Sequence, residues 1–141
     1  MANLTVNATE VRPLIGAVVR QITNGDTASY TGRAGFIAAD GELDPADASS
    51  AAGVTGQMGL IVAGLTADTA GVIDAAEVCT IVLTGPVYMG KDAAMDESAP
   101  IYFSEDAGRL TQTKPTISRI AGYAMSPTVM MWNPDPSGPS S

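Results

Sequence analysis

Glycine and proline interrupt this chain so often that it has little room for long helices. The 141 residues include 15 glycines and 9 prolines, and the apolar segments between them are short. A helix in a globular domain needs a longer periodic segment, whereas a strand does not. The sequence therefore predicts an all-β protein.

The predicted strands are rich in Val, Ile, Thr, Tyr and Phe, which suit a pleated, half-buried surface. They are Ala17–Ile22, Gly35–Ala39, Met58–Ala63, Val78–Thr84, Pro100–Ser104, Ile120–Met125 and Thr128–Trp132. Turn residues separate them, among them Asp40-Gly41 and Gly85-Pro86. Many short strands with frequent turns indicate a small single-domain β-barrel or β-sandwich.

Two stretches depart from this strand pattern. Asp44 to Gly53 allows one short helix, with Asp44 as the N-cap, Pro45 as the first helical residue and Gly53 at the end. An Ala/Ser-rich surface loop is the alternative. The small, polar stretch Thr66–Glu77 is predicted to be a hairpin loop, with room for one helical turn.

Both ends of the chain look like appendages to a central domain. Residues 1–13 are polar and β-permissive, which predicts an extended N-terminal arm, and residues 14–132 form the β-rich domain. Residues 133–141 contain three prolines, which remove ladder donors, so they are predicted to be a flexible Pro/Ser tail.

The two halves of the domain echo each other. Asp26–Leu43 aligns with Asp92–Leu110 when one residue is inserted before the second glycine, so that Phe36 matches Tyr102 and Leu43 matches Leu110. Each copy is an apolar strand, an acidic Gly turn and a partner strand. Packing the two units together would bury their apolar faces. Convergent turn chemistry is the alternative explanation.

Charge and composition exclude several classes of function. The formal net charge is -8 and the sequence pI about 4.1, which argues against nucleic acid and against an anionic membrane surface as partners. The chain contains no histidine, so no Ser-His-Asp or Cys-His system can form. The single cysteine, Cys79, is expected to be a buried apolar residue. We therefore expect no enzymatic activity and no cofactor.

The N-terminus has neither a basic start nor a continuous apolar stretch, so the sequence predicts no secretory signal. We expect synthesis in a cytoplasm.

Four acidic residues form the best candidate for a metal site. Asp40, Glu42, Asp44 and Asp47 alternate as at the start of a calcium loop. Pro45 and Ala51 stand where such a loop needs glycine and glutamate. A solvated acidic turn is therefore the favoured interpretation, and no metal is expected.

Met125, Met130 and Met131 beside Trp132 have two interpretations. They fill the core, or they form an apolar patch that another subunit covers. Core filling is favoured.

Two groups of segments together resemble the small decoration (cement) proteins that coat the capsids of tailed phages. The first group is Ala8–Leu14, Gly16–Arg20, Gly25-Asp26, Gly35–Gly41, Pro45–Ala48 and Gly59–Val62. The second is Gly85–Val87, Ala99–Ser104, Gly108–Leu110, Ala121–Ala124 and Trp132–Pro134. Where this family usually has a Val-Tyr pair before the first acidic turn, this chain has Phe36-Ile37, a conservative change.

The resemblance implies a structural protein on the exterior of the virion. It would bind the major capsid protein, bridge neighbouring subunits and stabilise the head against the pressure of packaged DNA. Self-association is expected, as a homotrimer or a dimer. A tail-fibre or baseplate module of a phage is the alternative function, followed by a small carbohydrate-binding module.

The hypothesis for the capsid contact is the end of the N-terminal arm. Its residues are Thr9, Glu10, Val11, Arg12, Pro13 and Leu14. Extended residues can add a strand to an exposed sheet edge, and an arginine can pair with a carboxylate there. The alternative is that this segment is the first strand of the domain.

Overall fold

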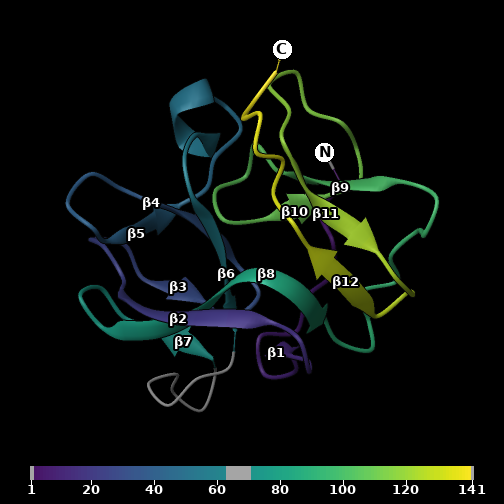
Figure 1. Ribbon diagram of the computed structural model, residues 1–141, viewed down its shortest axis with the longest axis horizontal. Helices are drawn as coiled ribbons and strands as arrows, with labels where there is room; N and C mark the ends of the chain where they lie inside the picture. The colour runs from purple at the N-terminus through teal and green to yellow at the C-terminus, as the bar shows by residue number, and fades with distance from the viewer. Residues whose placement is uncertain (1, 63–70, 141) are drawn as a thin grey trace.

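The computed structural model describes residues 2–62 and 71–140, and these residues are almost entirely strand and turn (Figure 1). A four-residue 3-10 helix, η1 (Ala51–Val54), is the one helix in those ranges. The antiparallel sheet curls into half a barrel, which confirms the predicted all-β class.

The strands fall into two groups that share one long member. In chain order they are β1 (Arg12–Pro13), β2 (Val18–Thr23), β3 (Ser29–Tyr30), β4 (Ala34–Ile37), β5 (Leu43–Pro45), β6 (Met58–Val62), β7 (Val72–Ile73), β8 (Val78–Tyr88), β9 (Pro100–Phe103), β10 (Leu110–Thr111), β11 (Ile120–Ala124) and β12 (Val129–Trp132). The main sheet runs β10-β9-β11-β12-β8-β6-β4-β5, and β1 and β2 also pair with β8. Strands β3 and β7 form a separate pair.

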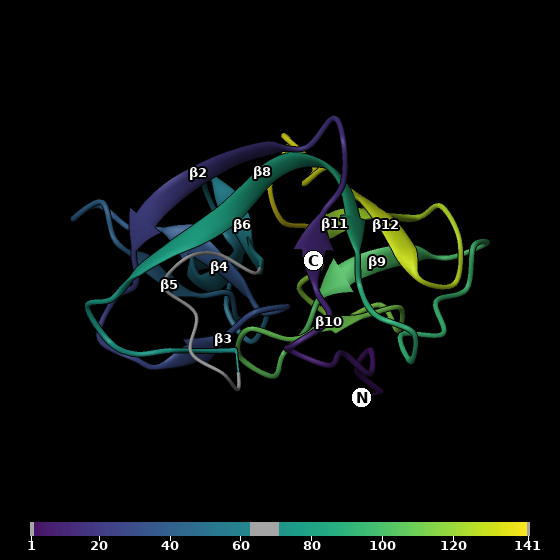
Figure 2. The same ribbon diagram turned by 90° about the horizontal axis from the view of Figure 1, so that it is seen from below.

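Strand β8 passes through both groups, as its long arch in Figure 2 shows. Its first part pairs with β2 and β6, and its last part pairs with β1 and β12. The change of partners falls at Gly85, whose φ of +123° is open to glycine and strained for other residues. A Cβ at Gly85 would lie 2.5 Å from the Cα of Ala17. The close approach of these two backbones therefore requires glycine.

Every strand predicted from the sequence is present, although β8 is longer than expected. The predicted turn at Gly85-Pro86 is wrong, because both residues stay paired with β12. The glycine bends the strand without ending it. Ala63 and residues 66–70 of the predicted hairpin loop lie outside the described residues.

The helix predicted from Asp44 is wrong. Asp44 and Pro45 belong to β5 and pair with Phe36 and Gly35 of β4. The 3-10 helix begins only after Ser50, whose side-chain oxygen accepts a hydrogen bond of 3.3 Å from the Gly53 amide. Asp44 and Pro45 pair with β4 and so cannot start a helix. The stretch is a short strand, then a loop, then one turn of 3-10 helix.

The internal echo extends to the register of the strands. Ile37 pairs with Leu43 in the first hairpin, and the matching residues Phe103 and Leu110 pair in the second.

The glycines on the following strands match as well. Gly59 of β6 lies opposite Gly35, and Gly122 of β11 lies opposite Ile101, the residue that corresponds to Gly35. The structure thus repeats a three-stranded unit, β5-β4-β6 and β10-β9-β11.

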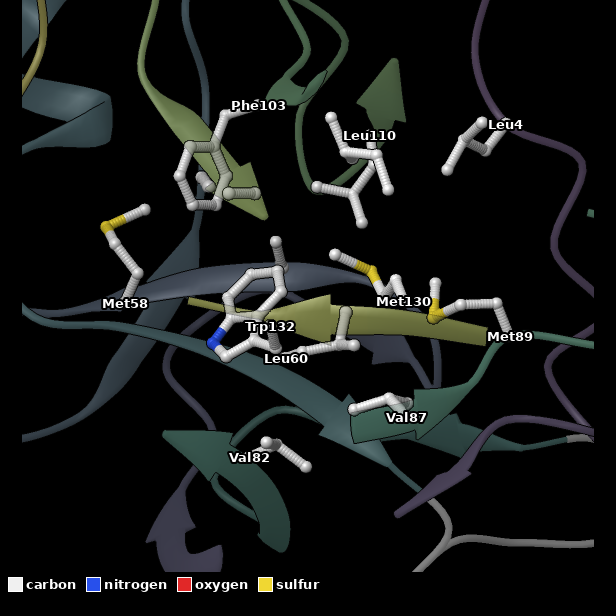
Figure 3. Close-up of a cluster of buried hydrophobic side chains, with 14 of the residues drawn as sticks. Leu4, Met58, Leu60, Val82, Val87, Met89, Phe103, Leu110, Met130 and Trp132 are labelled. Atoms are coloured by element: carbon white, nitrogen blue, oxygen red, sulfur yellow. The ribbon is translucent and has the colours of Figure 1, made fainter. Parts of the chain in front are cut away.

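The main core lies between the two units and is built around Trp132 (Figure 3). Its indole packs edge-on against the Phe103 ring, with centroids 5.7 Å apart and an interplanar angle of 87°. Leu60 of β6 and Leu110 of β10 come from the two units, and Val82 of β8 and Met130 of β12 come from the strands between them. A smaller cluster fills the curl of the first unit with Ile22, Leu43, Ile61, Ile73, Cys79 and Ile81.

The Pro-rich C-terminal segment differs from the predicted flexible tail over residues 133–140. The amides of Asn133 and Asp135 donate to the carbonyls of Ala121 and Ile120 at 2.9 Å each. Ser140 and Ser118 exchange two hydrogen bonds of 2.7 and 2.8 Å. The segment therefore continues beyond β12 alongside β11 as an irregular extension of that pairing.

Replacing Gly122 tests the close packing of β11 on β12. A Cβ at Gly122 would lie 2.0 Å from the backbone oxygen of Met131, so Gly122→Ala must push the two strands apart. We expect a loss of unfolding free energy of about 3 kcal/mol in urea denaturation. A Cβ at Gly56 would meet no atom within 4 Å, and φ there is +87°. Gly56→Ala should therefore cost only about 1 kcal/mol, and equal losses would contradict this account.

Candidate interaction surface

The acidic residues singled out as metal candidates do not converge on one point. Asp40 accepts a hydrogen bond from the Glu42 amide at 2.9 Å in the β4–β5 turn, and Asp47 accepts one from the Ser49 amide at 2.9 Å. The pKa of Glu42 is raised mainly by the charge of Asp40, and the pKa of Asp44 is raised mainly by burial. Residues 2–62 and 71–140 contain no group of three or more acidic, Cys or His side chains placed to hold a metal ion. Asp40 repels Glu42 and Asp44 around the β4–β5 turn, and Asp47 lies beyond β5.

The only cysteine is placed to pack and not to react. Cys79 is 1% exposed and belongs to the small cluster inside the first unit. Burial, followed by the charge of Glu77, raises the pKa of its thiol to about 11. Thiolate is the reactive form, so this position is inert at neutral pH.

The six residues of the proposed contact segment lie against the domain. Val11 is fully buried in the main core. Arg12 and Pro13 pair with Tyr88 and Val87 as strand β1, and the Leu14 amide donates to the Pro86 carbonyl at 3.0 Å. This arrangement corresponds to the alternative interpretation, a first strand of the domain, over Arg12–Pro13.

Thr9 and Glu10 are held by neighbouring groups. The backbone amide and hydroxyl of Thr9 both donate to the Asn7 side-chain oxygen, at 3.1 and 2.8 Å. A Glu10 carboxylate oxygen accepts from the Lys91 amide at 3.0 Å. Thr9, Arg12 and Leu14 remain exposed, Glu10 and Pro13 are half-buried, and Val11 cannot meet a partner without leaving the core.

Further upstream the chain is anchored too, which differs from a detached arm. Leu4 is 8% exposed, and its amide donates to the Leu110 carbonyl at 2.8 Å. The Thr111 hydroxyl donates to the Ala2 carbonyl at 2.6 Å. Residues 2–13 thus close the core over β10 and β8.

Two of the proposed contact residues join a larger exposed surface. In an antiparallel sheet, directly paired residues point to the same face. The pairs Arg12–Tyr88, Tyr88–Val129, Pro86–Met131 and Met131–Tyr123 therefore lie on one side of β1, β8, β12 and β11. Leu14 and Met125 continue the alternation beyond β1 and β11. We call this surface the Tyr–Met face, and its residues are Arg12, Leu14, Pro86, Tyr88, Tyr123, Met125, Val129 and Met131.

The Tyr–Met face is apolar on a strongly acidic molecule. Tyr123 is 50% exposed, Met125 55% and Leu14 37%, and none of the eight residues of the face is acidic. Its single charge, on Arg12, lies 4.9 Å above the Tyr88 ring centroid. Tyr, Met and Arg without carboxylates are the composition of a protein interface.

The two interpretations of the methionines hold for different residues. Met130 and Trp132 are fully buried, whereas Met131 and Met125 belong to the Tyr–Met face. Successive residues of a strand point to opposite faces of the sheet, so Met130 faces the core and Met131 faces out. The pairing of β11 with β12 identifies which residues lie on the outer face.

Trimming Val11 should destabilise the whole domain. Val11→Ala removes buried methyl groups from the main core, so we expect a loss of unfolding free energy of about 2 kcal/mol. Val19 is 48% exposed on β2, and Val19→Ala should stay within about 0.5 kcal/mol. Urea denaturation of both variants decides this, and equal stability would mean that Val11 is not a core residue in solution.

The thiol of Cys79 should resist modification in the folded protein. With a pKa of about 11, only about one thiol in a thousand is ionised at pH 8. A disulfide reagent at pH 8 should react slowly with Cys79 in the native protein. In 6 M guanidinium, where the protein is unfolded, it should react at the rate of a free thiol. Rapid reaction of the native protein would show that the cysteine is accessible.

The described part of the chain holds no helix with the length and apolarity to cross a membrane. Comparison with family models, with curated proteins and with solved structures finds no match to this chain.

Proposed function

We propose that this chain is a structural phage protein that binds the outer surface of the mature capsid. It would bridge neighbouring major capsid subunits and so stabilise the head against the pressure of packaged DNA. The proposal rests on the resemblance of its segments to phage decoration proteins and on the all-β domain. The observation that carries it furthest is the Tyr–Met face.

An apolar face on an acidic molecule suits a protein that must stay soluble before it binds. The net charge of -8 opposes non-specific aggregation of the free protein. The Tyr–Met face offers aromatic and methionine side chains that gain from desolvation against a protein partner. A cement protein needs both properties, because it is made free and then coats a protein lattice.

The face lies on paired strands, which hold its side chains in a fixed arrangement. Strand β12 lies between β8 and β11, so the central residues of the face cannot move independently. A preorganised surface loses less entropy on binding than a mobile arm does. We therefore assign the capsid contact to the Tyr–Met face, including Arg12 and Leu14 of the segment Thr9–Leu14.

Association of several copies would strengthen a modest contact. One chain of this size offers a standard or smaller interface. A homotrimer, or a dimer, would engage several capsid subunits at once and raise the overall affinity without new contacts. Analytical ultracentrifugation of the free protein measures this state directly.

Co-sedimentation with phage particles tests the proposed function. The purified chain should sediment with expanded, DNA-filled capsids of the phage that encodes it, and not with immature shells. Binding to isolated tails and not to heads would favour the tail-fibre or baseplate alternative. Binding to a glycan array and to neither particle would favour a carbohydrate-binding module.

Substitutions on the Tyr–Met face should weaken capsid binding. The double variant Tyr123→Ser/Met125→Ser removes two exposed side chains, so we expect at least about tenfold weaker binding with little change in stability. The matched control is Val78→Ser, which alters a residue that is 40% exposed at the far end of β8. Unchanged binding of the double variant would remove this face from the contact.

A further inference from the structure

The structure contains a small hollow lined by two arginines, Arg33 and Arg109. Its volume is about 150 Å³, and it is framed by three segments that are distant in the sequence. Leu4, Val6 and Ala8 come from the N-terminal segment, Tyr30–Arg33 from the connection between β3 and β4, and Arg109-Leu110 from the start of β10. This hollow does not include any residue of the Tyr–Met face.

The two arginines are held close together in spite of their equal charge. Burial, followed by the positive charge of Arg109, lowers the pKa of the Arg33 guanidinium. That guanidinium lies 5.0 Å from the centroid of the half-exposed Tyr30 ring. Gly108 makes room for its stem, because a Cβ there would lie 3.2 Å from the Arg33 Cδ.

No carboxylate of the described residues neutralises this pair. Lys91–Asp92 is the one ion pair within 4.0 Å in residues 2–62 and 71–140. The nearest acid in the sequence, Asp106, accepts a hydrogen bond from the Asn3 side chain at 2.7 Å. Across the same residues, neither guanidinium of the pair donates a hydrogen bond, although each carries five N–H groups.

Arg119 provides a comparison, because it is a buried arginine whose guanidinium donates its hydrogen bonds within the protein. It is 6% exposed, and its guanidinium donates to the carbonyls of Val54, Gly56 and Asp135 at 3.0, 2.7 and 2.9 Å. Its donors are thus used internally. Arg33 and Arg109 have comparable donors with no hydrogen-bond acceptor among residues 2–62 and 71–140.

We propose that the hollow between Arg33 and Arg109 is a binding site for a carboxylate. Two guanidinium groups at one hollow can give a carboxylate charge-assisted, forked hydrogen bonds. The volume admits one side-chain carboxylate or a small dicarboxylic acid. Tyr30, Leu4 and Leu110 also line the hollow, and apolar surroundings strengthen the electrostatic attraction. The site would bind a carboxylate whether or not the chain coats a capsid.

The test is a titration of the full chain at low salt, followed by NMR of the arginine Nε–Hε groups. One arm uses acetyl-glutamate amide, which mimics an acidic residue of a partner protein, and a second arm uses succinate. Acetyl-glutamine amide, of the same shape and without charge, is the neutral control. The signals of Arg33 and Arg109 should shift saturably with a carboxylate and not with the control.

Matched variants separate this site from general attraction to positive charge. Arg33→Gln and Arg109→Gln should each weaken binding at least about tenfold, whereas Arg20→Gln should change it less than about twofold. Arg20 is exposed on β2, so its replacement removes the same charge from a different surface.

Each outcome decides the proposal. Binding of acetyl-glutamate amide identifies a protein side chain as the source, and binding of succinate alone identifies a free small acid. No saturable shift in the wild-type protein, or equal weakening by Arg20→Gln, would overturn the site. The wild-type titration stands even if one of the glutamine variants fails to fold.

Discussion

The whole fold depends on one strand that belongs to both halves of the molecule. Strand β8 supplies Ile81 and Val82 to the first half and Val87 to the second, and all three are fully buried. Neither three-stranded unit covers its own apolar face, so the units are stable only when they share β8 and close on Trp132. Gly85 allows β8 to pair with strands of both halves, because the backbone bends at this residue. A side chain at Gly85 would clash with Ala17.

The two units are similar in register but different in surroundings. The turn of the second unit is built into the first, since the Ala34 amide donates to the Gly108 carbonyl at 2.8 Å and the Gly108 amide donates to Ala46 at 2.6 Å. The turn of the first unit is exposed, and the space around Gly41 is open. The repeated sequence motif therefore forms a hydrogen-bonded contact with the other unit in one copy and a charged surface turn in the other copy.

The sequence predicted the strands that are long enough to show their own pattern. Strands β2, β4, β6, β9, β11 and β12 each carry apolar residues between turn signals, and so does most of β8. The short strands were missed because two or three residues are too few to show an alternation of apolar and polar side chains. Leu43–Pro45 is a strand only because it pairs with β4. Asp44-Pro45 has the local signals of a helix start, but these residues are extended here because they pair with β4.

The surfaces were harder to predict than the core. Arg12 and Leu14 were proposed as contact residues from the sequence, but Tyr123 and Met125 join them on one face only through β12, which no local pattern reveals. The N-terminal segment was expected to stand apart because it is polar, yet Leu4 and Val11 are enough to hold it in place. Arg33 and Arg109 were not singled out, since their proximity depends on how the second turn docks.

The central position of β8 also sets the order in which this molecule can form. Strand β2, near the start of the chain, has β8 as its sheet partner, and β12, near the end, needs β8 as well. On the ribosome, the first sixty or so residues would emerge with an unpaired strand and an uncovered apolar sheet. Because such pairings are distant in sequence, they form slowly and leave edges open in the meantime. The synthesis of β12, more than any local segment, is what allows this domain to close its core.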